Sequence, residues 1–165
     1  MNKTVMNINK IQIIIGLAAL LLGFSVYTIR SPGSVFFVPE YFFYLQFSDY
    51  IVNMVRIAGN NLPGFIHPFS FILITSGLIF LTNRINQLLI CVGWFFLECF
   101  FELGQYFKEA YLRIIPHWFD DLPILEDTKK YFLKGTFDVF DMFFIFAGAA
   151  TAFFVLLITS KKRKE

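Results

Sequence analysis

Four acidic side chains stand inside, or at the edge of, two strongly apolar segments of this chain. They are Glu98 and Glu102 in the first segment and Asp138 and Asp141 at the start of the second. An acid inside a lipid-spanning segment costs free energy unless it faces the interior of a helix bundle or a polar partner. Acids kept at such positions therefore indicate a polar site.

Helical spacing places these acids in two groups, each on one face of a helix. Glu98 and Glu102 are four residues apart, and Gln105 follows three residues later, so all three project from one side. Asp138 and Asp141 are three residues apart and share a face in the same way. The sequence therefore predicts two polar helix faces.

Small residues continue the face that carries Asp141. Gly148 follows Asp141 by seven residues, and Ala152 comes four residues after that. Small residues let helices approach closely in lipid. We therefore expect a packing seam at Gly148 and Ala152, which turns Asp141 toward the interior of a bundle.

The elements that must position these residues are membrane-spanning helices. The chain has 165 residues, of which 57% are hydrophobic and 16% charged, and its mean hydropathy is +0.64. A soluble domain of this size cannot bury so much apolar surface. Four apolar runs approach the roughly 20 residues that a helix needs to cross a bilayer, namely 11–29, 65–81, 88–107 and 137–159. Because strand-like alternation is absent, the sequence predicts one all-α integral membrane domain over residues 1–165.

The distribution of charge predicts the orientation of the four spans. One side carries basic residues almost alone (Lys3, Lys10, Arg84, Lys161, Lys162, Arg163 and Lys164, with only Glu165 acidic). The two long connectors on the other side balance basic residues with acids. Cytoplasmic loops carry the excess of Lys and Arg. We therefore expect a multi-pass protein of the cytoplasmic membrane with both termini cytoplasmic.

Both outer connectors are expected to contain structure. In the first, residues 45–58 alternate apolar pairs with polar singles at helical spacing, which predicts a short interfacial helix. The second, residues 108–134, predicts a compact cap with a further interfacial turn at 116–119.

In this topology the second helix begins, the third ends and the fourth begins at the outer face. Polar residues stand near each of these ends, so we expect them to form one site in the outer leaflet. Its members are Glu102, Gln105, Asp138 and Asp141, with Glu98 and His67 in support.

Three chemistries suit such a set. Carboxylates from Glu102 and Asp141 could bind a divalent cation such as Mg²⁺, Ca²⁺ or Mn²⁺. Crowded acids raise one another's pKa, so one of them could stay protonated at neutral pH and act as a general acid or proton carrier. Acids could also accept hydrogen bonds from the hydroxyls of a lipid-linked sugar or the ammonium of a peptide.

A purely structural interpretation stays open beside these. Asp138 and Asp141 begin a helix, where carboxylates cap free N–H groups, and His67 could be a structural donor beside Pro68. The chain contains no legible nucleophile–base pair, phosphate loop or His-rich metal motif, so binding is favoured over catalysis.

The ordered motifs resemble the VanZ-like membrane proteins. They are Glu102-Leu-Gly-Gln105 at the end of one apolar run, Asp138-Val-Phe-Asp141 with Gly148 in the next, and Phe65-Ile-His67-Pro-Phe69. Ile145 departs from the pattern, which usually has Asn four residues after the second Asp. The resemblance implies an envelope role and an association with resistance to lipid-anchored glycopeptide antibiotics.

The expected function is to bind or modulate a membrane lipid or a lipid-linked envelope precursor at the acidic pocket. Two alternatives remain: a metal-assisted enzyme acting on a lipid head group, and an accessory subunit of a larger membrane complex. The expected partners are membrane lipids and either a membrane protein or a second copy of the chain, with no nucleic acid.

Overall fold

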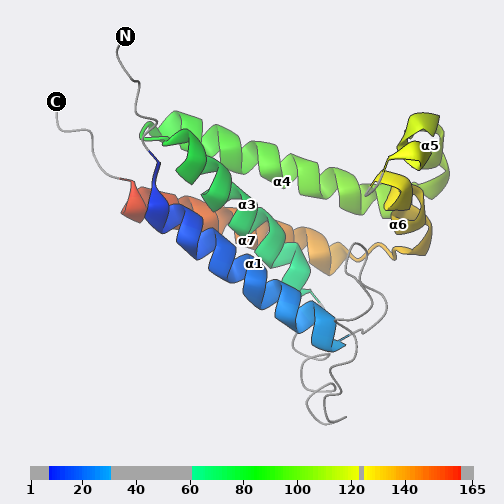
Figure 1. Ribbon diagram of the computed structural model, residues 1–165, viewed down its shortest axis with the longest axis horizontal. Coiled ribbons are helices and arrows are strands. Elements are labelled where there is room, and N and C mark those ends of the chain that lie inside the picture. Colours follow the sequence, from blue (N-terminus) through cyan, green and yellow to red (C-terminus); the bar gives the residue numbers. More distant parts are fainter. Residues whose placement is uncertain (1–7, 31–60, 123–124, 161–165) are drawn as a thin grey trace.

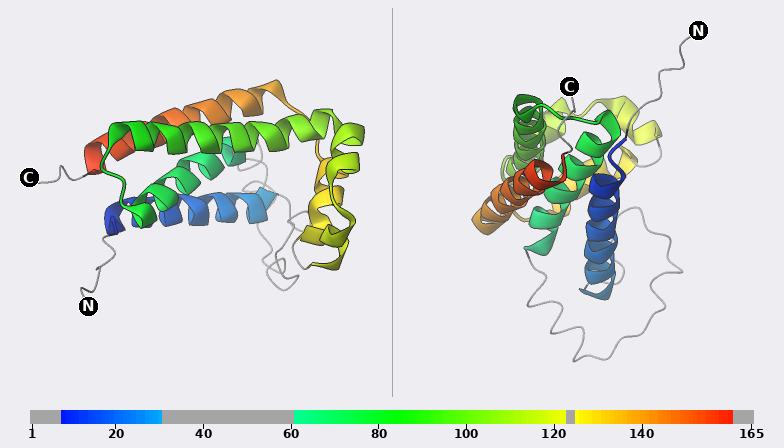
Figure 2. Two further views of the ribbon diagram at one scale, coloured as in Figure 1. Left: turned by 90° about the horizontal axis from the view of Figure 1, so that it is seen from above. Right: turned by 90° about the vertical axis from the view of Figure 1, so that its left-hand side faces the viewer.

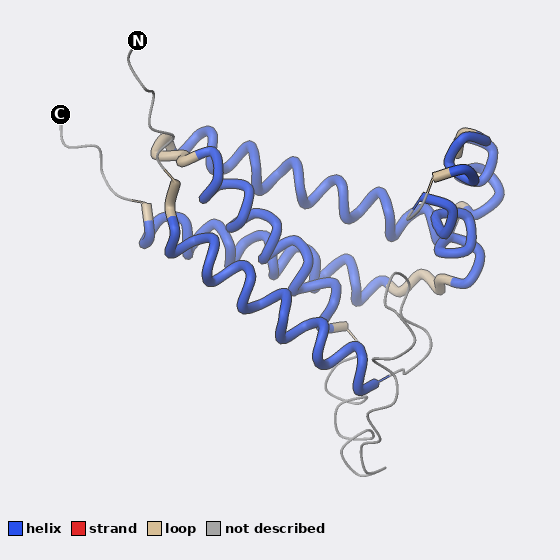
Figure 3. The backbone as a smooth tube through the Cα atoms, viewed as in Figure 1, coloured by secondary structure: helices blue, strands red, loops and turns tan. Residues whose placement is uncertain are grey.

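The computed structural model describes residues 8–30, 61–122 and 125–160, and these ranges are helical apart from short loops (Figure 3). The long helices are α1 (Lys10–Arg30), α3 (Leu62–Ile79), α4 (Arg84–Tyr106) and α7 (Val139–Thr159). Shorter helices lie between α4 and α7: α5 (Lys108–Ile114), η2 (His117–Asp121), η3 (Leu125–Asp127) and α6 (Thr128–Lys134). The described ranges contain no strand, which confirms the all-α prediction for them. The interfacial helix predicted at 45–58 lies outside the described residues.

Three helices, α3, α4 and α7, are long and apolar enough to cross a membrane by length and composition. They coincide with three of the four predicted spans. The described part of α1 offers a shorter apolar stretch, Lys10–Val26, so its role as a fourth span remains a prediction. Helix α4 begins at Arg84, before the predicted run, because the Asn83 side chain accepts a hydrogen bond from the Ile85 N–H and caps the helix.

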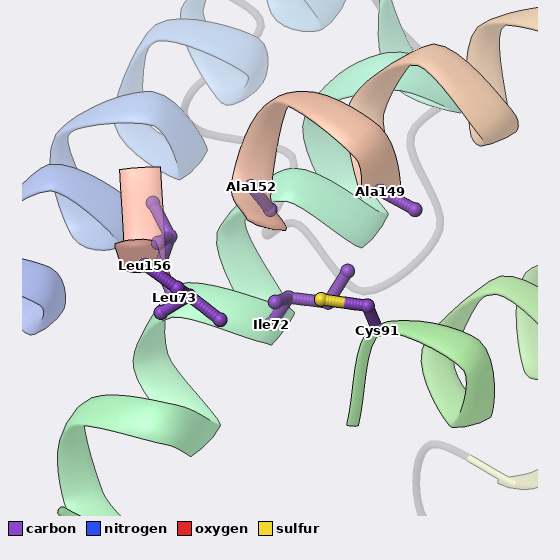
Figure 4. Close-up of a cluster of buried hydrophobic side chains, with 6 residues drawn as sticks. All are labelled: Ile72, Leu73, Cys91, Ala149, Ala152 and Leu156. Carbon is purple, nitrogen blue, oxygen red and sulfur yellow. The ribbon is translucent and has the colours of Figure 1, made fainter. Parts of the chain in front are cut away.

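Helix α3 lies between α1 and α7, and α4 packs along α7 (Figures 1 and 2). The hydrophobic core joins three of these helices. Figure 4 shows its members, which are Ile72 and Leu73 from α3, Cys91 from α4, and Ala149, Ala152 and Leu156 from α7. Neighbouring helices of the chain run in opposite directions, so α3 begins, α4 ends and α7 begins at one end of the bundle (Figure 1).

Gly148 and Ala152, the residues of the predicted seam, are both buried. Ala152 is fully buried in the core. A side chain at Gly148 would collide with the Phe65 carbonyl oxygen and approach Pro68. The absence of a side chain therefore lets α7 lie directly against the backbone of α3.

The cap predicted from the second connector is helical. Its η2 helix covers most of the expected turn at 116–119. Phe132 of α6 is 2% exposed, and a side chain at Gly104 of α4 would overlap its ring. Helix α6 is therefore seated on the last turns of α4 (Figure 1).

We predict that Gly148→Ala destabilises the bundle, because the added Cβ meets the α3 backbone, which cannot rotate away. Overpacking of this kind costs about 1–3 kcal/mol. The free energy of unfolding can be measured by denaturant titration in detergent, followed by circular dichroism. Gly93→Ala is the matched control, since nothing lies within 4 Å of a Cβ at Gly93. Equal losses in the two variants would contradict the close contact.

Candidate functional site

The Glu102 side chain joins the end of α4 to the start of α7. It is 8% exposed, and its Oε1 accepts a hydrogen bond from the Asp138 backbone N–H at 3.1 Å. Its Oε2 accepts from Gln105 Nε2 at 3.3 Å. Both oxygens of this buried carboxyl group are therefore bonded to the protein.

Gln105 extends the connection to the cap. Its Nε2 also donates to the Tyr131 hydroxyl at 2.9 Å, which links α4 to α6. A Cβ at Gly135 would lie 2.5 Å from Gln105 Oε1, so a side chain there would force this amide to shift. Tyr131 and Gly135 carried no distinguishing pattern in the sequence, and the structure adds them to the site.

Asp138 contributes to the contact through its backbone. Its side chain is exposed and caps α7, where Oδ1 accepts from the Phe140 N–H at 2.9 Å. Its own N–H, which precedes the helix, is free to bond Glu102. The carboxylate of Asp138 therefore caps the helix, as the structural interpretation of the sequence proposed, while its N–H bonds Glu102.

Asp141 joins the start of α3 to α7. Its Oδ1 accepts from Asn61 Nδ2 at 3.0 Å. A Cβ at Gly64 would lie 3.3 Å from the Asp141 carbonyl oxygen, so the two helices are also close here. Asn61 was missed in the sequence, although a polar residue directly before the Pro63-containing helix start is a signal for such a role.

Glu98 and His67 stand apart from these hydrogen bonds. Glu98 lies one helical turn from Glu102, is half-buried, and has no hydrogen-bond partner among the residues that the structure describes. His67 is exposed, and its ring lies beside Phe71 of the same helix with 6.1 Å between ring centroids. The structure thus connects Glu102 to Gln105 and Asp138, connects Asp141 to Asn61, and gives Glu98 no hydrogen-bond partner among the described residues.

Within the described ranges, no three His, Cys, Asp or Glu side chains are grouped so that they could hold a metal ion. The two candidate ligands proposed from the sequence, Glu102 and Asp141, accept hydrogen bonds from different partners.

A second polar cluster lies at the opposite end of the bundle and was also missed in the sequence. Gln12 of α1 and Gln87 of α4 are each 1% exposed. Gln12 Nε2 donates to Thr159 Oγ1 at 3.0 Å, and Gln87 Nε2 donates to Ser160 Oγ. Asn9 Nδ2 also donates to the Thr159 carbonyl at 3.0 Å. These bonds hold the start of α1 beside the end of α7.

No protein-family model, no curated protein and no solved structure matches this chain. The contacts just described are therefore the basis on which its function has to be inferred.

We predict that Glu102→Ala destabilises the protein by about 1–3 kcal/mol, because the Asp138 N–H loses its acceptor and the Gln105 amide loses one of its two acceptors. Amide hydrogen exchange at Asp138 should also accelerate, since its N–H loses the bond from α4. Both can be measured in detergent, by denaturant titration and by mass-spectrometric hydrogen exchange.

Glu109→Ala, at an exposed position of α5, is the control for removal of a glutamate. If the Asp138 amide exchanged at the same rate in wild type and Glu102→Ala, the hydrogen bond between α4 and α7 would be absent in solution.

Proposed function

We propose that this chain is a multi-pass protein of the cytoplasmic membrane that engages a lipid head group. The site would be the end of the bundle where α3 begins, α4 ends and α7 begins. The head group would belong to a membrane lipid or to a lipid-linked envelope precursor.

The observation that carries the proposal is the unbonded carboxyl group of Glu98. It is half-buried in a helix apolar enough to span a membrane, and no described residue donates a hydrogen bond to it. Such a group is costly in lipid unless it meets a polar partner. A head group with hydroxyl or ammonium donors supplies that partner, because carboxyl oxygens accept hydrogen bonds from both.

The fixed neighbours of Glu98 favour binding over chemistry. Glu102 and Gln105 are held by hydrogen bonds to the start of α7 and to Tyr131. The polar groups of these two side chains are therefore held in fixed positions on the same helix as Glu98. Rigid side chains bind a ligand at a lower entropic cost than mobile ones.

We further propose that the chain belongs to the VanZ-like family, with four spans and both termini cytoplasmic. Support comes from the contact between its two main motifs, since Glu102 accepts from the Asp138 N–H. The bond between Asn9 and Thr159 keeps the start of α1 and the end of α7 on one side, as an even number of spans requires. An envelope role of this kind would include an influence on glycopeptide antibiotic susceptibility.

The second candidate is an accessory subunit in which the acids act as polar glue between helices. It is favoured by the protein partners of Glu102 and Asp141. Polar contacts between helices can hold an apolar bundle together without any ligand. The two candidates differ in what they require of Glu98.

We predict that Glu98→Leu keeps or raises the melting temperature and weakens lipid binding. The variant loses a carboxyl group that is costly in an apolar environment, so the folded protein is not destabilised. The variant also loses the acceptor for the head group. Phosphatidylglycerol, whose head group carries hydroxyls, is the probe. Its affinity, measured by native mass spectrometry in detergent, should fall about tenfold.

Phe96→Leu is the matched control, because Phe96 is an exposed apolar residue of the same helix. It should change neither the affinity nor the melting temperature. A lower melting temperature of Glu98→Leu with unchanged affinity would instead favour the accessory subunit.

The metal-assisted alternative has its own test. Wild type, Glu102→Gln and Asp141→Asn are melted with Mg²⁺, Ca²⁺ or Mn²⁺. A ligand that binds only the folded state raises the melting temperature. A rise in wild type that both variants lose would replace the proposal with a metal site.

A further inference from the structure

An open depression lies at the junction of α4 and α5. Its lining begins at Tyr106, the residue after Gln105, and contains none of the polar residues of the candidate site described above. Its volume is about 510 Å³. Its lining consists of Tyr106, Phe107, Lys108, Glu109, Ala110 and Arg113. The depression therefore combines aromatic rings with two basic side chains directly after an apolar helix that could cross a membrane.

The Arg113 guanidinium is available to a ligand. The residue is exposed, and it has no ion-pair or hydrogen-bond partner within the described residues. Glu109 lies one turn earlier on the same helix, but no ion pair joins its carboxylate to Arg113 among the described residues. Arg113 is therefore a cation beside the depression, and Glu109 does not neutralise its charge through a direct contact.

Lys108 is the second cation of the depression, and it is held in place. Its Nζ donates to the Leu133 carbonyl oxygen of α6 at 3.1 Å. An ammonium group has three donors. Two of them stay available, so Lys108 can bond a ligand without leaving the cap.

The aromatic residues give the depression an apolar wall. Tyr106 is 63% exposed and Phe107 is 52% exposed, and their rings meet edge to face with 4.7 Å between centroids. Aromatic rings at the end of a span are typical of the level of lipid head groups. An apolar wall next to cations suits a molecule that has both an apolar and an anionic part.

We propose that this depression binds a lipid-borne phosphate group, with Arg113 and Lys108 on the phosphate oxygens and the two aromatic rings against the adjoining lipid carbon atoms. Arginine matches phosphate because its planar fork can donate two parallel hydrogen bonds. The inference rests on the proposed function, and it adds the charge of the ligand and a second point of contact.

The test compares three probes on the full chain in neutral detergent, by native mass spectrometry. They are phosphatidic acid, diacylglycerol with the same acyl chains, and inorganic phosphate. Phosphatidic acid should bind at least about tenfold more tightly than diacylglycerol, since only phosphatidic acid carries anionic oxygens that can pair with the two cations. Inorganic phosphate should displace it only at a large molar excess, because it lacks the apolar part.

Three variants separate the site from general electrostatics. Arg113→Gln should weaken phosphatidic acid binding about tenfold, and Glu109→Gln should strengthen it roughly twofold by removing a neighbouring negative charge. Arg84→Gln removes an equal charge from an exposed arginine at the opposite end of α4 and should leave the affinity unchanged.

Equal weakening by Arg113→Gln and Arg84→Gln would overturn the inference, as would equal binding of diacylglycerol. Displacement by inorganic phosphate at comparable concentration would overturn the assignment to a lipid. Binding of phosphatidylglycerol that depends on Glu98 but not on Arg113 would overturn this inference alone. No lipid binding by wild type would overturn the proposed function as well.

Discussion

The close contact at Gly148, which has no side chain, fixes the position of α7 along α3. Because nothing stands between α7 and the Phe65 carbonyl of α3, the two backbones touch at one defined height. Asp141 lies two turns earlier on the same face of α7, and it therefore arrives opposite Asn61. The first residues of α7 then fall beside the last turn of α4, where Glu102 accepts the Asp138 N–H.

The lengths of the acidic side chains match the two tasks at the start of α7. Asp138 is short and reaches a backbone N–H two residues away, as helix caps do. Glu102 is longer and reaches an N–H on another helix. Glu98 has the same reach one turn deeper, but beyond the first turn of α7 every N–H is already bonded within the helix. Among the described residues, Glu102 therefore has a hydrogen-bond partner at the start of α7, whereas Glu98, one turn deeper, has none.

The length of the apolar runs was sufficient to predict three apolar helices. The alternating direction of those runs also predicted that Glu102 and Asp138 lie at one level, because antiparallel neighbours bring the end of one helix beside the start of the next. It could not predict that Asp138 would join through its N–H, since a backbone donor is present at every residue except proline and leaves no mark in the sequence.

Other parts of the site were hidden for different reasons. Apolar residues of helix α3 are spread around its circumference, so its pattern does not show which face is buried; His67 is exposed. The half-buried Tyr131 and the buried Gln87 lie in polar stretches, where a single inward-facing residue has no periodic signal. In the hydropathy pattern Gln12 only interrupts an apolar run, whereas in the structure its side chain donates a hydrogen bond to Thr159.

The hydrogen bonds of Gln12 and Gln87 also impose an order on biosynthesis. Gln12 and Gln87 are synthesised before their partners, Thr159 and Ser160. That end of the bundle therefore cannot close until residues 159 and 160 have been made. Until it closes, two glutamine side chains destined for burial must find water, lipid head groups or the translocation machinery as temporary partners.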